Sequence, residues 1–116
     1  MIKTDNIEVP TRKEEICDAN IIEVEAGTTG YKGGDSGHGG RTYFRISNVS
    51  GTDMRLSFHA EVGRGTLEQR IAPSGKLVHG CDLECDSFEL EFGGDAELDT
   101  FIRALEFTLE TLKSQR

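Results

Sequence analysis

The sequence predicts a two-layer α+β domain, in which a single long C-terminal helix covers one face of an antiparallel sheet of about five or six strands. Several segments alternate apolar and polar residues with a period of two, the pattern of a strand with one buried face. Short turn-forming stretches separate these segments, which favours a meander of neighbouring strands. One segment near the C-terminus instead repeats its apolar residues with helical spacing.

Length and composition are typical of a single folded domain. The chain has 116 residues, of which 35% are hydrophobic and 29% charged, enough for one modest core. We expect residues 20–116 to form this domain. Residues 1–19 are rich in charge and contain Pro10, so we expect an N-terminal arm with a short strand at Ile7–Val9.

Three further observations predict a cytoplasmic protein. No apolar run is long enough to span a membrane. The N-terminal segment is too charged for the core of a signal peptide. The 3 cysteines are an odd number, which fits a reducing compartment better than a disulfide framework.

The predicted strands follow one another along the chain, with glycine, proline, serine and aspartate between them. The clearest is Met54–Val62, because its alternation continues over the whole segment. Together the predicted strands are 20–26, 43–49, 54–62, 66–71, 76–79 and 87–92.

The polar positions of these strands would share the second face of the sheet. They are Glu23, Glu25, Tyr43, Arg45, Ser47, Arg55, Ser57, His59, Glu61, Glu68, Arg70, Glu89 and Glu91. A face of this kind is usually solvated. The alternative is that its arginine, histidine, glutamate and tyrosine side chains form the floor of a binding site.

The helix is predicted to begin at Asp95, as the N-cap residue after Gly94. Its apolar stripe, expected to cover the sheet, consists of Leu98, Phe101, Ile102, Leu105, Leu109 and Leu112. Phe107 departs from this stripe and shares the polar side of the helix with Arg103. An aromatic residue on a polar helix face favours a subunit contact, so we expect a homo-oligomer that uses these two residues.

The most unusual segment is the loop from Gly27 to Thr42, which contains half of the chain's 14 glycines. Loops of this length without structure of their own are usually functional or disordered. Successive glycine N–H groups can converge on an anion, and Arg41 can add a bidentate fork. The spacing matches neither a P-loop nor a dinucleotide-binding fingerprint, since a strand follows rather than a helix. The expected ligand-binding residues are Gly33, Gly34, Asp35, Ser36, Gly37, His38, Gly39, Gly40, Arg41, Tyr43 and His59.

The charge balance narrows the choice of partners. With 21 acidic and 13 basic residues the net charge is -8, which disfavours direct binding to nucleic acid or to an anionic membrane. It leaves an anionic small molecule held by local donors, or a basic protein partner. His79, Cys81 and Cys85 lie close together, but the second pair of ligands typical of a zinc site is missing. We therefore expect no metal and no cofactor.

The sequence favours a binding protein over an enzyme. The leading hypothesis is a small cytosolic protein whose Gly-rich loop 27–42 holds an anionic small molecule such as a nucleotide. A second hypothesis is an acidic inhibitor or adaptor, of the phage or mobile-element type, that occupies the basic groove of a nucleic-acid-binding partner. A third is a small hydrolase or isomerase that uses His38 or His59 with a carboxylate. No nucleophile and base stand at a useful spacing, so no catalytic residue is assigned.

Overall fold

The computed structural model describes residues 1–62, 65–71 and 86–116. Its strands are β1 (Ile2–Thr4), β2 (Ile7–Val9), β3 (Thr11–Cys17), β4 (Ile21–Thr28), β5 (Thr42–Ser50), β6 (Met54–Val62), β7 (Gly65–Ile71) and β8 (Ser87–Phe92). A short 3-10 turn, η1 (Ser36–His38), lies between β4 and β5, and the helix α1 (Asp95–Gln115) ends the chain. The predicted strand at 76–79 lies outside the described residues. The described part of the chain contains no helix whose length and hydropathy would let it cross a bilayer.

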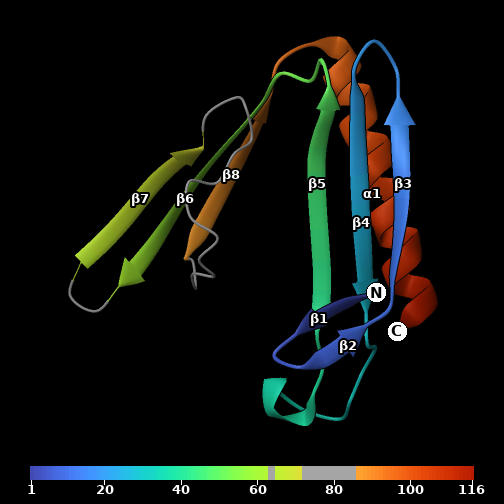
Figure 1. Cartoon of the computed structure of the whole chain (residues 1–116), viewed down its shortest axis with the longest axis vertical. Helices are drawn as coiled ribbons and strands as arrows, with labels where there is room; N and C mark the ends of the chain where they lie inside the picture. Colours follow the sequence, from blue (N-terminus) through green and yellow to red (C-terminus); the bar gives the residue numbers. More distant parts are fainter. Residues whose placement is uncertain (63–64, 72–85) are drawn as a thin grey trace.

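The predicted α+β class, with antiparallel strands and one C-terminal helix, is confirmed for the described residues. The expectation of a single meander is wrong, because the strands form three sheets: β1-β2, β3-β4-β5 and β7-β6-β8 (Figure 1). The break falls between β5 and β6, where Gly51 has φ 68°. The side chain of Asn48 donates to the carbonyl of Thr52 at 2.8 Å and accepts from its N–H at 3.3 Å. These local bonds turn the chain away instead of returning it along β5.

The N-terminal segment is also more ordered than an arm. β1 and β2 form a hairpin, and β3 pairs with β4 from Thr11↔Gly27 to Cys17↔Ile21. The sequence of β3 gave no strand signal because Ile16 is its one buried residue and charges fill most other positions. Such charges are typical of an edge strand, which they protect from pairing with other chains.

The core lies between α1 and the sheet β3-β4-β5. It consists of Ile16, Ile22, Val24 and Ala104, with Ile46 and Phe107 packed against it. Figure 1 shows α1 behind β3 and β4, while β5 lies to one side of the helix.

The face that α1 turns toward the sheet differs from the predicted one. The buried helix residues are Glu97, Thr100, Ala104 and Thr111, which are mostly small. Small side chains let the helix backbone approach β4 closely and leave little room for leucines. The predicted stripe is instead largely exposed: Leu98 56%, Ile102 44%, Leu105 47% and Leu109 56%.

Phe107 and Arg103 are engaged within the chain. Phe107 is half-buried against the core, and the Arg12 guanidinium carbon lies 5.6 Å from the centre of its ring. Arg103 donates to the carbonyl of Cys17 at 3.2 Å. The side of the helix that looked polar in sequence is therefore the side next to the sheet, and Phe107 is a core contact.

A buried polar junction joins α1 to two turns of the sheet. Asn20 is 2% exposed, and its side-chain amide donates to the hydroxyls of Thr52 at 3.1 Å and Thr100 at 3.0 Å. Nearby, the Glu97 carboxylate accepts from the N–H of Asp53 at 3.2 Å. Because α1 starts after Gly94, which offers no side-chain cap, these contacts fix the beginning of the helix.

Candidate functional site

The Gly-rich loop is closed at its base by a continuation of the β4–β5 pairing. The N–H of Thr29 donates to the carbonyl of Arg41 at 2.9 Å, and the N–H of Arg41 donates to the Thr29 hydroxyl at 3.0 Å. The hydroxyls of Thr28 and Thr42 lie 2.9 Å apart at the neighbouring pair. These bonds shorten the free loop to residues 30–40.

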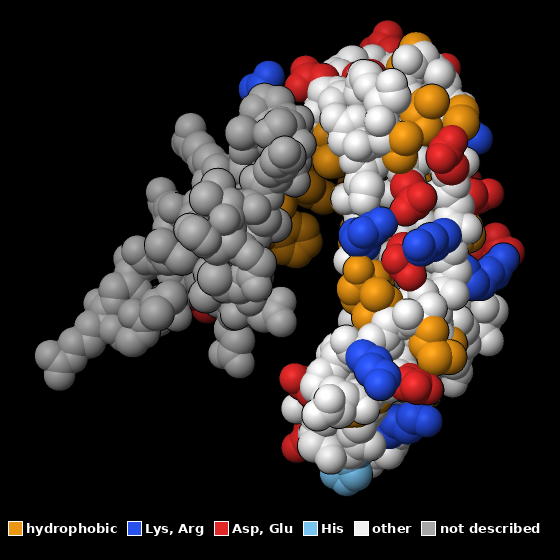
Figure 2. Space-filling model, in the orientation of Figure 1, with side chains coloured by type: hydrophobic (Ala, Val, Ile, Leu, Met, Phe, Trp, Pro, Cys, Tyr) orange, Lys and Arg blue, Asp and Glu red, His pale blue; other side chains and the backbone are white. Residues whose placement is uncertain are grey.

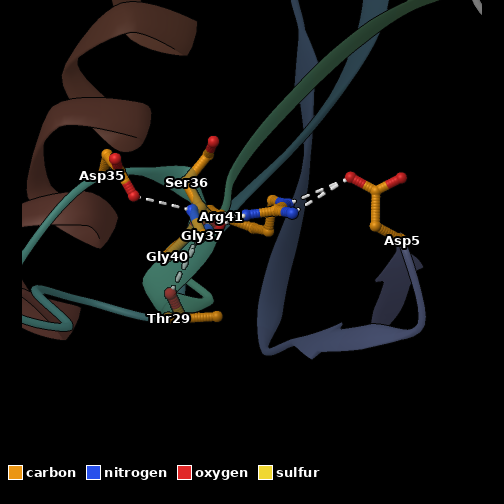
Figure 3. A network of polar contacts seen from close by, with 7 residues as sticks. All are labelled: Asp5, Thr29, Asp35, Ser36, Gly37, Gly40 and Arg41. Atoms are coloured by element: carbon orange, nitrogen blue, oxygen red, sulfur yellow. Dashed lines mark hydrogen bonds and ion pairs between the residues drawn. The ribbon is translucent and has the colours of Figure 1, made fainter.

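Asp35 organises the tip of the loop. Its carboxylate accepts from the N–H of Gly37 at 2.9 Å, which caps η1 (Figure 3). The same oxygen lies 3.3 Å from Nδ1 of His38. The Asp35 and His38 side chains are 85% and 58% exposed, so the pair stands in solvent. The tip thus uses its own polar groups to hold its turn.

Arg41 is fully used by the protein in this conformation. Its Nη1 donates to the carbonyls of Ser36 at 2.7 Å and Gly40 at 2.8 Å. Its Nε and Nη2 donate to Asp5 Oδ2 at 3.3 and 3.1 Å (Figure 3). Asp5 belongs to the turn of the β1–β2 hairpin, with φ 51°. Arg41 therefore ties the loop to the hairpin, and an incoming anion would have to replace Asp5.

A pocket lies between this loop and the C-terminal end of α1. It has a volume of about 300 Å³ and is lined by Thr28, Gly30, Tyr31, Gly40, Arg41, Thr42, Leu109, Leu112, Lys113 and Arg116. The helix end is held here by Gln115, whose side chain accepts from the N–H of Thr28 at 2.8 Å and donates to the carbonyl of Pro10 at 3.2 Å. Gly30 has φ 79°, and a Cβ placed there would lie 2.9 Å from the carbonyl oxygen of Gln115. A residue with a side chain at this position would be strained and would require the helix end to move.

The structure brings together only part of the predicted site. Gly40 and Arg41 line the pocket, whereas residues 33–38 lie in the exposed tip. Tyr43 is half-buried beside Gly27, on the face of the sheet opposite the helix. His59 lies in β6, in the sheet that Figure 1 shows apart from the loop.

The residues that sequence reasoning missed come from α1 and from the start of the loop. Leu109, Leu112, Lys113 and Arg116 are far from the loop in sequence, and nothing in the sequence links them to it. Lys113 and Arg116 looked like ordinary basic residues at the negative end of a helix. Tyr31, which is 81% exposed, was the one available signal, since an exposed aromatic within a glycine-rich loop is often used for binding.

On the polar face of β3-β4-β5, charged side chains interact with neighbouring side chains of the same face. Arg45 pairs with Glu23 at 2.9 Å, and the Thr11 hydroxyl donates to Glu25 at 2.6 Å. Glu25 is only 4% exposed. Figure 2 shows acidic and basic side chains interspersed over this face without a large area of one sign. The arrangement fits a solvated face better than the floor of a site.

The cysteine and histidine cluster considered as a zinc site is not part of the described structure. His79, Cys81 and Cys85 lie outside the described residues. Within the described residues, no group of three histidine, cysteine, aspartate or glutamate side chains is placed to hold a metal ion.

Comparison of this chain with models of protein families, with curated proteins and with solved structures gives no match. A functional argument for this protein therefore rests on the geometry of the site.

Proposed function

We propose that this protein binds a small molecule that has an apolar body and an anionic group, in the pocket between the Gly-rich loop and the end of α1. The observation that carries the proposal is the lining of this pocket, in which apolar side chains meet three cationic ones. Pockets that combine apolar walls with a few charged groups are the usual form of small-molecule sites. A volume of about 300 Å³ is at the lower end of their range, which suits a mononucleotide or an aromatic acid.

The charges of the pocket favour an anion. Lys113 and Arg116 form no salt bridge with any residue in the described ranges, and Arg41 pairs with the exposed Asp5. The C-terminal end of α1 carries a partial negative charge that offsets some of this potential. Affinity would therefore come mainly from the apolar walls, and the cations would select the charge of the ligand.

The loop would contribute through exchange of partners at Arg41. Asp5 is 77% exposed in its side chain, and an ion pair of this kind contributes little to stability. A ligand carboxylate or phosphate could take the place of Asp5 on the guanidinium at small cost. In this proposal the remaining loop glycines serve the fold of the loop, and the ligand contacts its base.

Thermal shift and titration calorimetry against nucleotides, phosphorylated metabolites and aromatic acids test the proposal. We expect at least one compound to raise the melting temperature, and Arg116→Gln and Tyr31→Ala each to weaken its binding by about tenfold, the loss of one good contact. Lys13→Gln is the matched control, because Lys13 is an exposed cation of β3 outside the pocket. If no compound stabilises the protein, or if the pocket variants bind as tightly as the control, the proposal is wrong.

A further inference from the structure

The exposed stripe of α1 has the spacing of a helix-pairing seam. Leu98, Ile102, Leu105, Leu109 and Leu112 follow one another at intervals of four, three, four and three residues. This is the spacing of the a and d positions of a coiled coil, where two helices pack side by side. Four of the five side chains are between 44% and 56% exposed, so about half of the surface of each is left uncovered within the described part of the chain.

The surroundings of the stripe extend this apolar surface. Phe44 lies on the helix side of β5, in register with the buried Ala26, and is 39% exposed because α1 covers β3 and β4 instead. The described elements do not pack into one compact body: the radius of gyration is 15.5 Å, against about 13 Å for a compact chain of this length, and Figure 1 shows the sheet β7-β6-β8 standing apart. A group of exposed apolar side chains of this size on a small protein often marks an interface.

The charges along α1 indicate what would cover the stripe. The first turn contains the exposed Asp95, and the last turn contains Lys113. Asp99 is exposed next to Leu98, and Lys113 is exposed next to Leu112. A second copy of this helix, laid antiparallel, would bring each acidic end against a basic end and would also oppose the helix dipoles favourably. Parallel alignment would place like charges together.

We propose that two copies of this chain form a symmetric dimer in which their α1 helices pack antiparallel along this stripe. The interface is then the same patch on both copies, related by a two-fold axis, which is the commonest form of homodimer. The leucine and isoleucine side chains of the seam would be removed from contact with water. Asp99 of one copy would lie near Lys113 of the other. This contact is separate from the sheet-facing side that contains Phe107 and Arg103.

The oligomeric state tests the proposal directly. Analytical ultracentrifugation of the full chain over micromolar to millimolar concentrations should show a dimer. Leu105→Glu, near the centre of the stripe, should weaken dimerisation by at least about tenfold, because it places a carboxylate in the apolar seam. Glu110→Gln, at an exposed helix position outside the stripe, is the control. Circular dichroism at low concentration should show the same helix content in both variants, since Leu105 is already half exposed in the single chain.

A charge exchange tests the antiparallel arrangement. Asp99→Lys and Lys113→Asp should each weaken the dimer, and the double variant should recover most of the loss. A protein that stays monomeric at every concentration, a dimer indifferent to Leu105→Glu, or a double variant weaker than both single ones would overturn the proposal. Binding of a monomeric chain to a basic helical protein through the stripe would also overturn it. Leu109 and Leu112 of the stripe, and Lys113 beside it, also line the pocket, so the two proposals share these side chains. Leu105 does not line the pocket, so ligand binding by the Leu105→Glu variant shows whether the pocket binds its ligand without the dimer.

Discussion

Replacement of Gly27 by alanine should severely destabilise the protein. Gly27 lies inside β4, between Thr11 of β3 and Tyr43 of β5, and is buried. A Cβ at this position would overlap the carbonyl oxygen of Pro10 and lie 2.8 Å from the Pro10 carbonyl carbon and the Thr11 Cα. All three atoms belong to the backbone, so no side-chain rotation can relieve the clash.

The expected loss of unfolding free energy follows from the cost of placing extra volume in a packed region. Overpacking typically costs about 1–3 kcal/mol, and a clash with backbone belongs at the upper end, about 3 kcal/mol. For a domain of this size that corresponds to a fall in melting temperature of roughly 12 °C. Urea denaturation followed by circular dichroism measures the free energy of unfolding directly.

The matched control is Gly40→Ala, in the loop that follows β4. The nearest atoms to a Cβ at Gly40 are 3.9 Å away. This variant should be neutral or stabilised by up to about 1 kcal/mol, because alanine restricts the unfolded chain. If the free energy of unfolding of Gly27→Ala stays within about 0.5 kcal/mol of the wild-type value, the backbone at Pro10 and Thr11 does not lie as close to Gly27 as described.

Four further predictions concern the helix and the loop. Phe107→Ala should cost about 2 kcal/mol of unfolding free energy, because the side chain is half-buried against the core. Leu109→Ala should lower the free energy of unfolding by less than about 1 kcal/mol in dilute solution, because Leu109 is 56% exposed. A larger loss for Leu109→Ala than for Phe107→Ala would mean that the stripe, and not Phe107, faces the sheet. Thr111→Val should stabilise by about 1 kcal/mol in thermal and urea unfolding, because the buried Thr111 hydroxyl has no hydrogen-bond partner among the described residues. A double-mutant cycle of Asp5→Ala and Arg41→Ala should give a coupling below about 1 kcal/mol, since Asp5 is exposed; a larger value would contradict the easy exchange proposed at Arg41.

The sequence by itself determined the local structure. β6 and β8 begin and end at the predicted residues, and α1 includes Asp95 as its first residue, although Gly94 rather than the predicted Asp95 is the N-cap. These elements follow from local periodicity, which a single segment contains in full. The loop glycines likewise marked residues 27–42, although the sequence could not show that Asp35 and Arg41 are used by the loop itself.

Only the tertiary structure decided which faces meet. An apolar stripe indicates that a helix buries one side, but it does not identify the surface that this side contacts. In this protein, small residues such as Ala104 pack α1 against β4, while Leu105 stays exposed. β3 escaped prediction because its partner supplies most of the apolar side chains. The pocket joins Tyr31 to Arg116 through packing of the helix end on the loop. Contacts between residues so far apart in sequence leave no local pattern, since they depend on how preformed elements pack.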